Sequence, residues 1–175
     1  MILEGPVSFR GKGLHGARPG EVVVHPGPPA EGILVRTPTG DVPIAQMRRD
    51  GSRRCSTLVH EPSGFRFAGS EHLLAALAGL ELWDTILDVK GDEIPVLDGS
   101  AALFAQRLVR SSHRGSPPID ALTVQEPIRV RSRDGFVEAV PARVPSIHIC
   151  IVFENPLVGR QHWSWKRDPD SFLHQ

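Results

Sequence analysis

The hydrophobic pattern of this chain changes period near residue 70. Before that point, short β-branched runs end in clusters of proline and glycine, which is typical of strands joined by tight turns. Residues 61–64 have the composition of a hairpin turn. The strands expected in this part cover residues 21–25, 32–36, 55–59 and 65–67.

Residues 70–80 form the strongest predicted helix. Ser70 suits the N-cap position, and Glu71 suits the positive end of the helix dipole. The apolar side chains are spaced i, i+1, i+4 and i+7, which places them on one helix face: Leu73, Leu74, Leu77 and Leu80.

The pattern after this helix alternates between extended and helical segments. Residues 85–89 and 93–97 are predicted strands, and Ser100 can cap a second helix over residues 101–110. Strands resume at residues 128–130, 135–140, 146–153 and 162–165, and residues 168–172 have the composition of a helix start.

The polar segment 113–120 contains glycine and two prolines, and we predict that it links two domains. The first domain then covers residues 1–112 and the second covers residues 121–175. The few elements expected after the linker make the second domain incomplete. The predicted fold class is α+β, with one complete domain and a truncated second one.

Composition narrows the classes of function. Lys and Arg balance Asp and Glu at 20 each, so no net charge favours nucleic acid or an anionic membrane. No apolar run approaches the roughly 18 residues of a membrane span, and no signal peptide is recognised at the amino terminus. Cys55 and Cys150 form no CxxC pattern, so we expect reduced thiols in a cytoplasmic protein.

The chemical candidate with the best placement is the pair Glu71-His72, which lies where a strand turns into the predicted helix. Consecutive helix positions point about 100° apart, so two neighbours reach one site only at a helix entry. A carboxylate there can carry a proton beside a metal-binding imidazole. A helix-end acid next to a solvated histidine is the alternative, and it stays open on these residues alone.

The other candidates are weaker. The eight histidines form no HxxxH or HExxH pattern, and we interpret Asp170 and His174 as a first-turn acid and a chain-end histidine. Residues 11–16 are glycine-rich but lack the strong strand and helix that flank a phosphate-binding loop. His15 therefore lies either on a loop that approaches a substrate or in a plain turn.

Three segments in order carry a family resemblance: Gly13-Leu14-His15, residues 70–80 and residues 93–101. With them the chain resembles the UDP-3-O-acyl-N-acetylglucosamine deacetylases, the zinc amidohydrolases of lipid A biosynthesis, and the likeness continues through residues 152–161. The resemblance implies two similar domains of sheet and helices with the active site between them.

The resemblance also implies a reaction and roles for individual residues. A zinc-bound water attacks the acetamide carbonyl of a UDP-linked, O-acylated glucosamine, and acetate and a free amine result. Glu71 corresponds to the general base and His72 to a zinc ligand. Cys55 falls where some members carry a cysteine near the metal, and His15 lies on a loop close to the substrate.

The resemblance implies two further zinc ligands, a histidine and an aspartate four residues later, which these 175 residues do not contain. A catalytic zinc takes three protein ligands, so we expect negligible turnover from this chain alone. Two alternatives stay open. The chain is a non-catalytic remnant or binding module that pairs with a partner chain, or a separate carboxyl-terminal half completes it.

Overall fold

The computed structural model describes residues 1–51, 55–115, 123–167 and 172. Contacts divide the chain into Met1–Ile119 and Asp120–Gln175, here called unit 1 and unit 2. No helix in the described part of the chain is long and apolar enough to cross a membrane.

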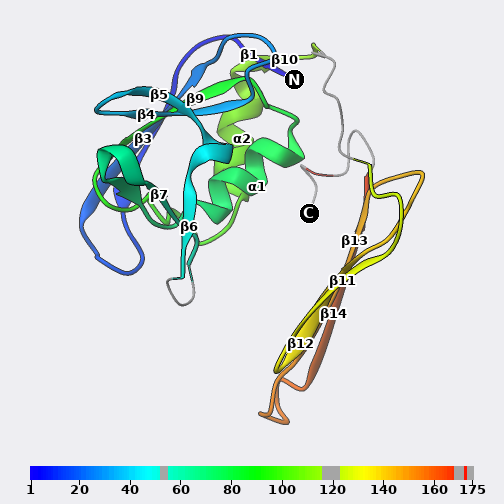
Figure 1. Cartoon of the computed structure of the whole chain (residues 1–175). Coiled ribbons are helices and arrows are strands. Elements are labelled where there is room, and N and C mark those ends of the chain that lie inside the picture. The colour runs from blue at the N-terminus through cyan, green and yellow to red at the C-terminus, as the bar shows by residue number, and fades with distance from the viewer. Residues whose placement is uncertain (52–54, 116–122, 168–171, 173–175) are drawn as a thin grey trace. The chain divides into compact units, whose positions relative to one another are not determined.

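Unit 1 is built on a five-stranded sheet with the order β2-β3-β9-β4-β5 (Figure 1). The β4–β9 pair is parallel, and the other pairs of this sheet are antiparallel. Its strands are β2 (Val7–Lys12), β3 (Pro19–Pro26), β4 (Ile33–Thr37), β5 (Gly40–Pro43) and β9 (Thr85–Lys90).

Alternating residues of these strands make the sheet half of the core. On β3, Val22 and Val24 are fully buried, and each pairs with an inward residue of both neighbouring strands. Val22 lies opposite Phe9 and Val89, and Val24 lies opposite Val7 and Leu87. The period of two therefore brings one apolar row from each strand onto the same face.

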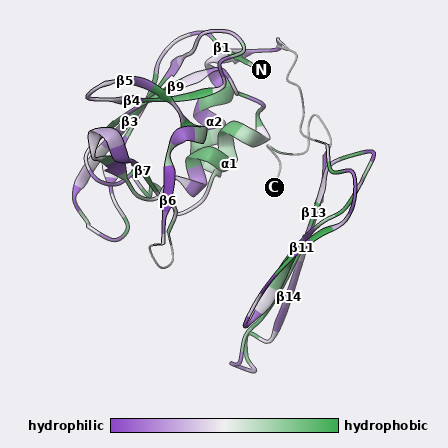
Figure 2. Ribbon diagram, viewed as in Figure 1, coloured by the Kyte–Doolittle hydropathy of each residue, from purple (hydrophilic) through white to green (hydrophobic). Residues whose placement is uncertain are grey.

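Two helices, α1 (Glu71–Gly79) and α2 (Ala102–Arg110), provide the other half of the core. The ring centroids of Phe104 on α2 and Phe9 on β2 lie 4.8 Å apart, and both side chains are fully buried. The apolar face expected from the sequence is the buried one, because Leu73 and Leu77 of α1 are inaccessible to solvent. Figure 2 shows hydrophobic positions on both helices.

A smaller antiparallel sheet, order β6-β7-β8, precedes α1 in the chain. Its strands are β6 (Arg48–Asp50), β7 (Thr57–His60) and β8 (Phe65–Phe67). The turn expected at residues 61–64 joins β7 to β8 and contains a 3-10 helix, Glu61–Ser63. A second 3-10 helix, Ile44–Gln46, precedes β6, and β1 (Ile2–Leu3) pairs with β10 (Ser112–His113).

Unit 2 contains two antiparallel hairpins in its described part. One pairs β11 (Ile128–Ser132) with β12 (Gly135–Ala139), and the other pairs β13 (Ser146–Val152) with β14 (Arg160–Lys166). Nearly all residues of these strands are exposed. The helix start expected at residues 168–172 falls, except for Phe172, outside the described residues.

The α+β class is confirmed, and two local predictions are wrong. Ser70 has helical backbone angles and does not cap α1, because its hydroxyl donates to the Ser56 carbonyl instead. Residues 93–97 form only an isolated bridge between Glu93 and Ala68, because Pro95 cannot donate to a ladder. The glycine-rich segment 11–16 begins within β2 and leads into strand β3, not into the helix that a phosphate-binding loop requires.

Candidate functional site

The carboxylate of Glu71 is held at the first residue of α1. Its Oε2 atom accepts a hydrogen bond from the backbone N–H of Ser56 at 3.0 Å. A carboxylate at this end of a helix is also favoured by the helix dipole. The side chain is half-buried, so it stays fixed while remaining within reach of solvent.

Ser70 joins the same two segments from the other side. Its hydroxyl donates to the Ser56 carbonyl oxygen at 3.1 Å, and its backbone N–H donates to that oxygen at 3.3 Å. Ser70 is fully buried. Both backbone groups of Ser56 are thus used to attach the segment before β7 to the start of α1.

Cys55 and His72 flank this attachment. The Cys55 Sγ atom lies 3.6 Å from the hydroxyl oxygen of Thr57, and the residue is half-buried. His72 is also half-buried, and its neighbour Leu73 points into the core. The structure therefore brings Cys55 close to the Glu71 carboxylate through Ser56, and it places His72 one residue further along α1.

His15 lies on a separate loop between β2 and β3, residues 13–18, here called the His15 loop. Its two ends meet where the Gly13 N–H donates to the Arg18 carbonyl at 3.0 Å. The side chain of His15 is exposed, and its backbone N–H donates to Glu93 Oε1 at 2.9 Å. The Gly16 N–H donates to the other oxygen, Glu93 Oε2, also at 2.9 Å.

A cavity of about 630 Å³ lies between the His15 loop and the small β6-β7-β8 sheet. Thr57 and Ala68 reach its wall from the segments that carry Cys55 and Glu71. Its charged and polar lining residues are Arg18, Thr57, Arg66, Asp92 and Glu93.

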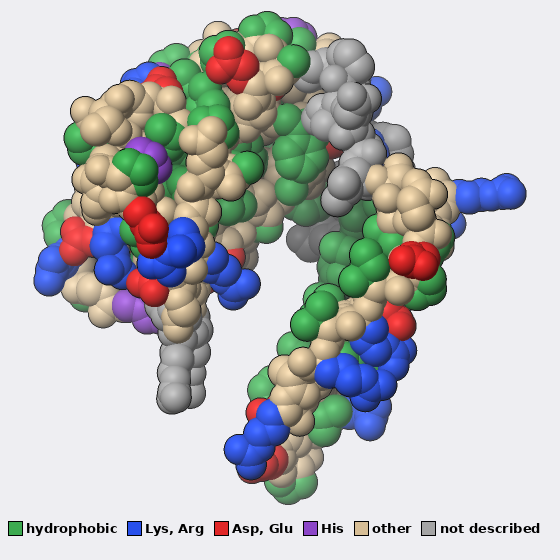
Figure 3. All heavy atoms as spheres, in the orientation of Figure 1, with side chains coloured by type: hydrophobic (Ala, Val, Ile, Leu, Met, Phe, Trp, Pro, Cys, Tyr) green, Lys and Arg blue, Asp and Glu red, His purple; other side chains and the backbone are tan. Residues whose placement is uncertain are grey.

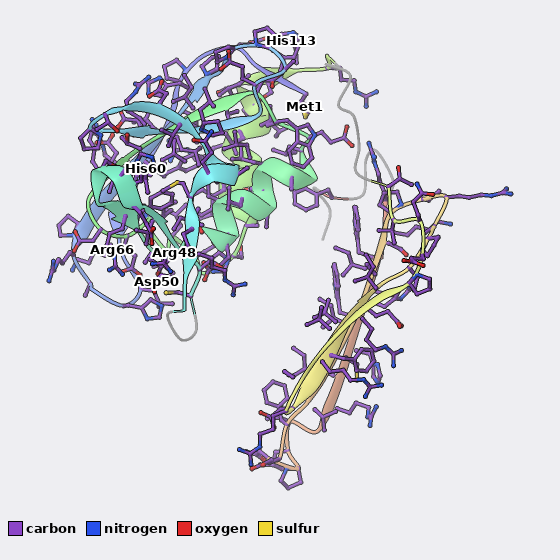
Figure 4. The ribbon with its side chains drawn as sticks, viewed as in Figure 1. Met1, Arg48, Asp50, His60, Arg66 and His113 are labelled. Carbon is purple, nitrogen blue, oxygen red and sulfur yellow. The ribbon has the colours of Figure 1, made fainter. Side chains whose placement is uncertain are left out.

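The arginines at this cavity are paired with carboxylates. Arg18 contacts Asp92 at 2.7 Å. Arg66 contacts Asp50 at 3.1 Å, and both of these residues are labelled in Figure 4. Figure 3 shows side chains of both signs close together on this part of unit 1. The charges therefore neutralise one another, in agreement with a chain that has no net charge.

The candidate residues do not form a metal site by themselves. Among the described residues, no three His, Cys, Asp or Glu side chains lie close enough together to hold a metal ion. A catalytic zinc takes three protein ligands, so the described part of the chain does not fit a zinc ion on its own. Asp170 and His174 lie outside the described residues.

Sequence reasoning missed Glu93 as a site residue, although it lies in the segment 93–101. Burial raises the pKa of Glu93, but hydrogen bonds from the backbone of the His15 loop outweigh this effect and lower it. A signal was available in the sequence, because Gly16 directly follows His15 and Glu93 directly precedes the apolar run at residues 94–97.

Comparison with known proteins gives a consistent result. The family model described as "LpxC: UDP-3-O-acyl N-acetylglycosamine deacetylase" matches residues 1–175. A UDP-3-O-acyl-N-acetylglucosamine deacetylase of Shewanella violacea is 34% identical over 93% of this chain and 55% of its own length. Another, from Geotalea uraniireducens, is 29% identical over 98% of this chain and 57% of its own length. The chain thus spans about half the length of these relatives.

Proposed function

Because the chain belongs to the UDP-3-O-acyl N-acetylglycosamine deacetylase family, we propose that it supplies part of a deacetylase active site. The substrate is a UDP-linked, O-acylated N-acetylglucosamine, and the reaction is a cytoplasmic step of lipid A biosynthesis. The observation that carries this proposal is the hydrogen bond from Ser56 to Glu71, which fixes a carboxylate at the start of α1 beside His72.

Glu71 is the general base. One of its oxygens accepts the Ser56 N–H, which leaves the other oxygen to take a proton from the attacking water. The water oxygen bonds to the acetamide carbon, and Glu71 passes the proton to the amide nitrogen as the C–N bond breaks. The free amine and acetic acid are released, and the acid loses its proton to solvent to give acetate. The fixed carboxylate favours this step because it needs little reorganisation before it accepts the proton.

His72 would be one ligand of a zinc ion, and the other ligands would come from outside these 175 residues. A bound zinc lowers the pKa of a water molecule and polarises the carbonyl group. His15 contacts the substrate from its loop, and Cys55 lies near the metal. One histidine ligand retains little metal affinity, so the chain alone has negligible turnover.

A chimaera tests this assignment. The part of the Shewanella violacea relative that this chain does not match is joined to residues 1–175, and acetate release from UDP-3-O-acyl-N-acetylglucosamine is measured. We expect activity from the chimaera and none from the chain alone. Glu71→Gln lowers the rate by roughly 10²-fold or more, because a general base contributes at least that factor.

Glu61→Gln is the matched control, since Glu61 is an exposed carboxylate of the same unit that pairs with Arg48. Its chimaera keeps full activity. An active Glu71→Gln chimaera would contradict the assigned base. Tight one-to-one zinc binding with deacetylation by the isolated chain would show that the site is complete without added residues.

A second candidate function is a non-catalytic module that pairs with a partner chain, in the simplest case a second copy. One face of the β13–β14 hairpin supports it, because large apolar side chains there are 43–49% exposed: Ile147, Ile149, Ile151 and Trp163. Exposed apolar strands are prone to pair with other chains.

Light scattering after size-exclusion chromatography separates the two functions. A pairing module gives a dimer that Ile149→Lys dissociates, whereas His148→Lys, on the opposite face of β13, leaves it intact. A monomer at every concentration counts against this second function.

A further inference from the structure

Glu93 connects two parts of unit 1 that are far apart in the sequence. On its backbone side, it forms a parallel bridge with Ala68. The Ala68 N–H donates to the Asp92 carbonyl at 2.9 Å, and the Ile94 N–H donates to the Ala68 carbonyl at 2.9 Å. Because Ala68 lies three residues before Glu71, the backbone of Glu93 is anchored to the segment that leads into α1.

The side chain of Glu93 binds the His15 loop. Its two carboxylate oxygens accept one backbone N–H each, from His15 and from Gly16. The sequence separations are 78 and 77 residues, so these contacts exist only in the folded chain. Hydrogen bonds from N–H groups to a carboxylate are about twice as strong as those between neutral groups.

Two glycines leave the space that this contact needs. A Cβ atom on Gly13 would lie 2.2 Å from Glu93 Oε2, and one on Gly20 would lie 2.6 Å from the Glu93 carbonyl oxygen. Neither distance is possible for real atoms, so side chains at these positions would displace Glu93. The approach of Glu93 therefore explains why Gly13 and Gly20 carry no side chain.

We propose that Glu93 is a positioning residue whose carboxylate holds the His15 loop in place, so that the His15 side chain faces a bound nucleotide sugar. Glu93 does not touch the ligand and acts through His15. The proposal rests on the proposed function for the role of His15, but the contact between Glu93 and the loop stands on the structure alone.

The first test measures the loop itself in the 175-residue protein. NMR hydrogen exchange at the His15 and Gly16 amides is compared in the unaltered protein, in Glu93→Gln and in Asp92→Asn. We expect exchange to become roughly tenfold faster or more in Glu93→Gln, because the amide loses an ionised acceptor. Asp92→Asn is the matched control. It removes one carboxylate charge at the adjacent residue, which pairs with the Arg18 side chain of the loop, while the His15 and Gly16 amides keep Glu93 as their acceptor.

Glu93→Asp is a second variant that keeps the charge but is one methylene shorter, so it gives an intermediate exchange rate. It also replaces Glu93→Gln if that variant does not fold. Equal exchange rates in the unaltered protein and the Glu93 variants would overturn the proposal.

The second test measures whether Glu93 acts through His15. The dissociation constant of UDP-N-acetylglucosamine is determined for Glu93→Gln, His15→Ala and the double variant. We expect each single variant to bind more weakly, and the double variant to bind as His15→Ala does. If Glu93→Gln weakens UDP-N-acetylglucosamine binding equally in the unaltered protein and in the His15→Ala variant, the positioning role is wrong. If the unaltered protein does not bind the probe while the exchange difference persists, the proposed substrate contact of His15 fails and the loop contact stands.

Discussion

Gly13→Ala is the sharpest test of the packing between Glu93 and the His15 loop. The new Cβ atom would lie 2.2 Å from Oε2, 2.5 Å from Cδ and 2.9 Å from Cβ of Glu93. Rotation of the carboxylate relieves the first two contacts but leaves the third. The backbone of Glu93 cannot retreat freely, because it is bridged to Ala68.

The size of the effect follows from the hydrogen bonds that Glu93 loses. A hydrogen bond to a charged group contributes about 1.5–3 kcal/mol, and two of them connect Glu93 to the loop. The Glu93 carboxylate and the two amides lie near solvent, so new hydrogen bonds to water offset part of this loss. Replacing glycine by alanine also lowers the conformational entropy of the unfolded chain. This stabilises the folded protein by about 0.4–1 kcal/mol. We expect a net loss of about 2 kcal/mol in the free energy of unfolding of unit 1.

Urea unfolding followed by circular dichroism at 222 nm measures this loss, because both described α-helices belong to unit 1. Gly16→Ala is the matched control. It makes the same change three residues away, where the new Cβ would lie at an ordinary 3.4 Å from Glu93 Oε2. The reasoning is refuted if Gly13→Ala and Gly16→Ala unfold at the same urea concentration.

Three further predictions concern pH, the core and the metal. The folded-state pKa of Glu93 lies below its ordinary value near 4.5, so its contribution is complete above that pH and is lost as the pH falls through the lowered value. Protection factors of the Gly16 amide should therefore hold from neutral pH down to about 4.5 and then decline as the pH falls through the lowered pKa of Glu93. Phe104→Ala should lower the free energy of unfolding by about 3–5 kcal/mol in the same urea assay, because a fully buried ring against Phe9 is lost; an unchanged midpoint would contradict this packing. Calorimetry should show that zinc binds at least about 100-fold more weakly to the isolated chain than to the chimaera. His72→Ala should strongly lower the zinc affinity of the chimaera. Equal affinities would contradict the role of His72.

Local sequence patterns predicted the elements with a clear period. The spacing of leucines over residues 70–80 predicted α1 and its buried face, and the turn at residues 61–64 predicted the β7–β8 hairpin. Both predictions succeed because neighbours in the sequence determine them. The strand β2 was missed, because its second half, Arg10-Gly11-Lys12, has the composition of a loop.

The pair Glu71-His72 was also identified from the sequence, since its place at a helix entry and the surrounding motif are both local features. Its partner Ser56 was not, because the hydrogen bond that holds Glu71 joins residues 15 apart. Ser70 illustrates the same limit. Its composition predicted an N-cap, but a tertiary contact with Ser56 used its hydroxyl instead.

By itself, then, the sequence determined the α+β class, the main helix, the family resemblance and the candidate residues Glu71 and His72. Only the tertiary structure decided that Glu93 binds the His15 loop and that Ser56 holds Glu71. The physical reason is that helix and hairpin patterns repeat over a few residues, whereas a carboxylate finds N–H donors 77 and 78 residues away only after the sheet brings β2, β3 and β9 together.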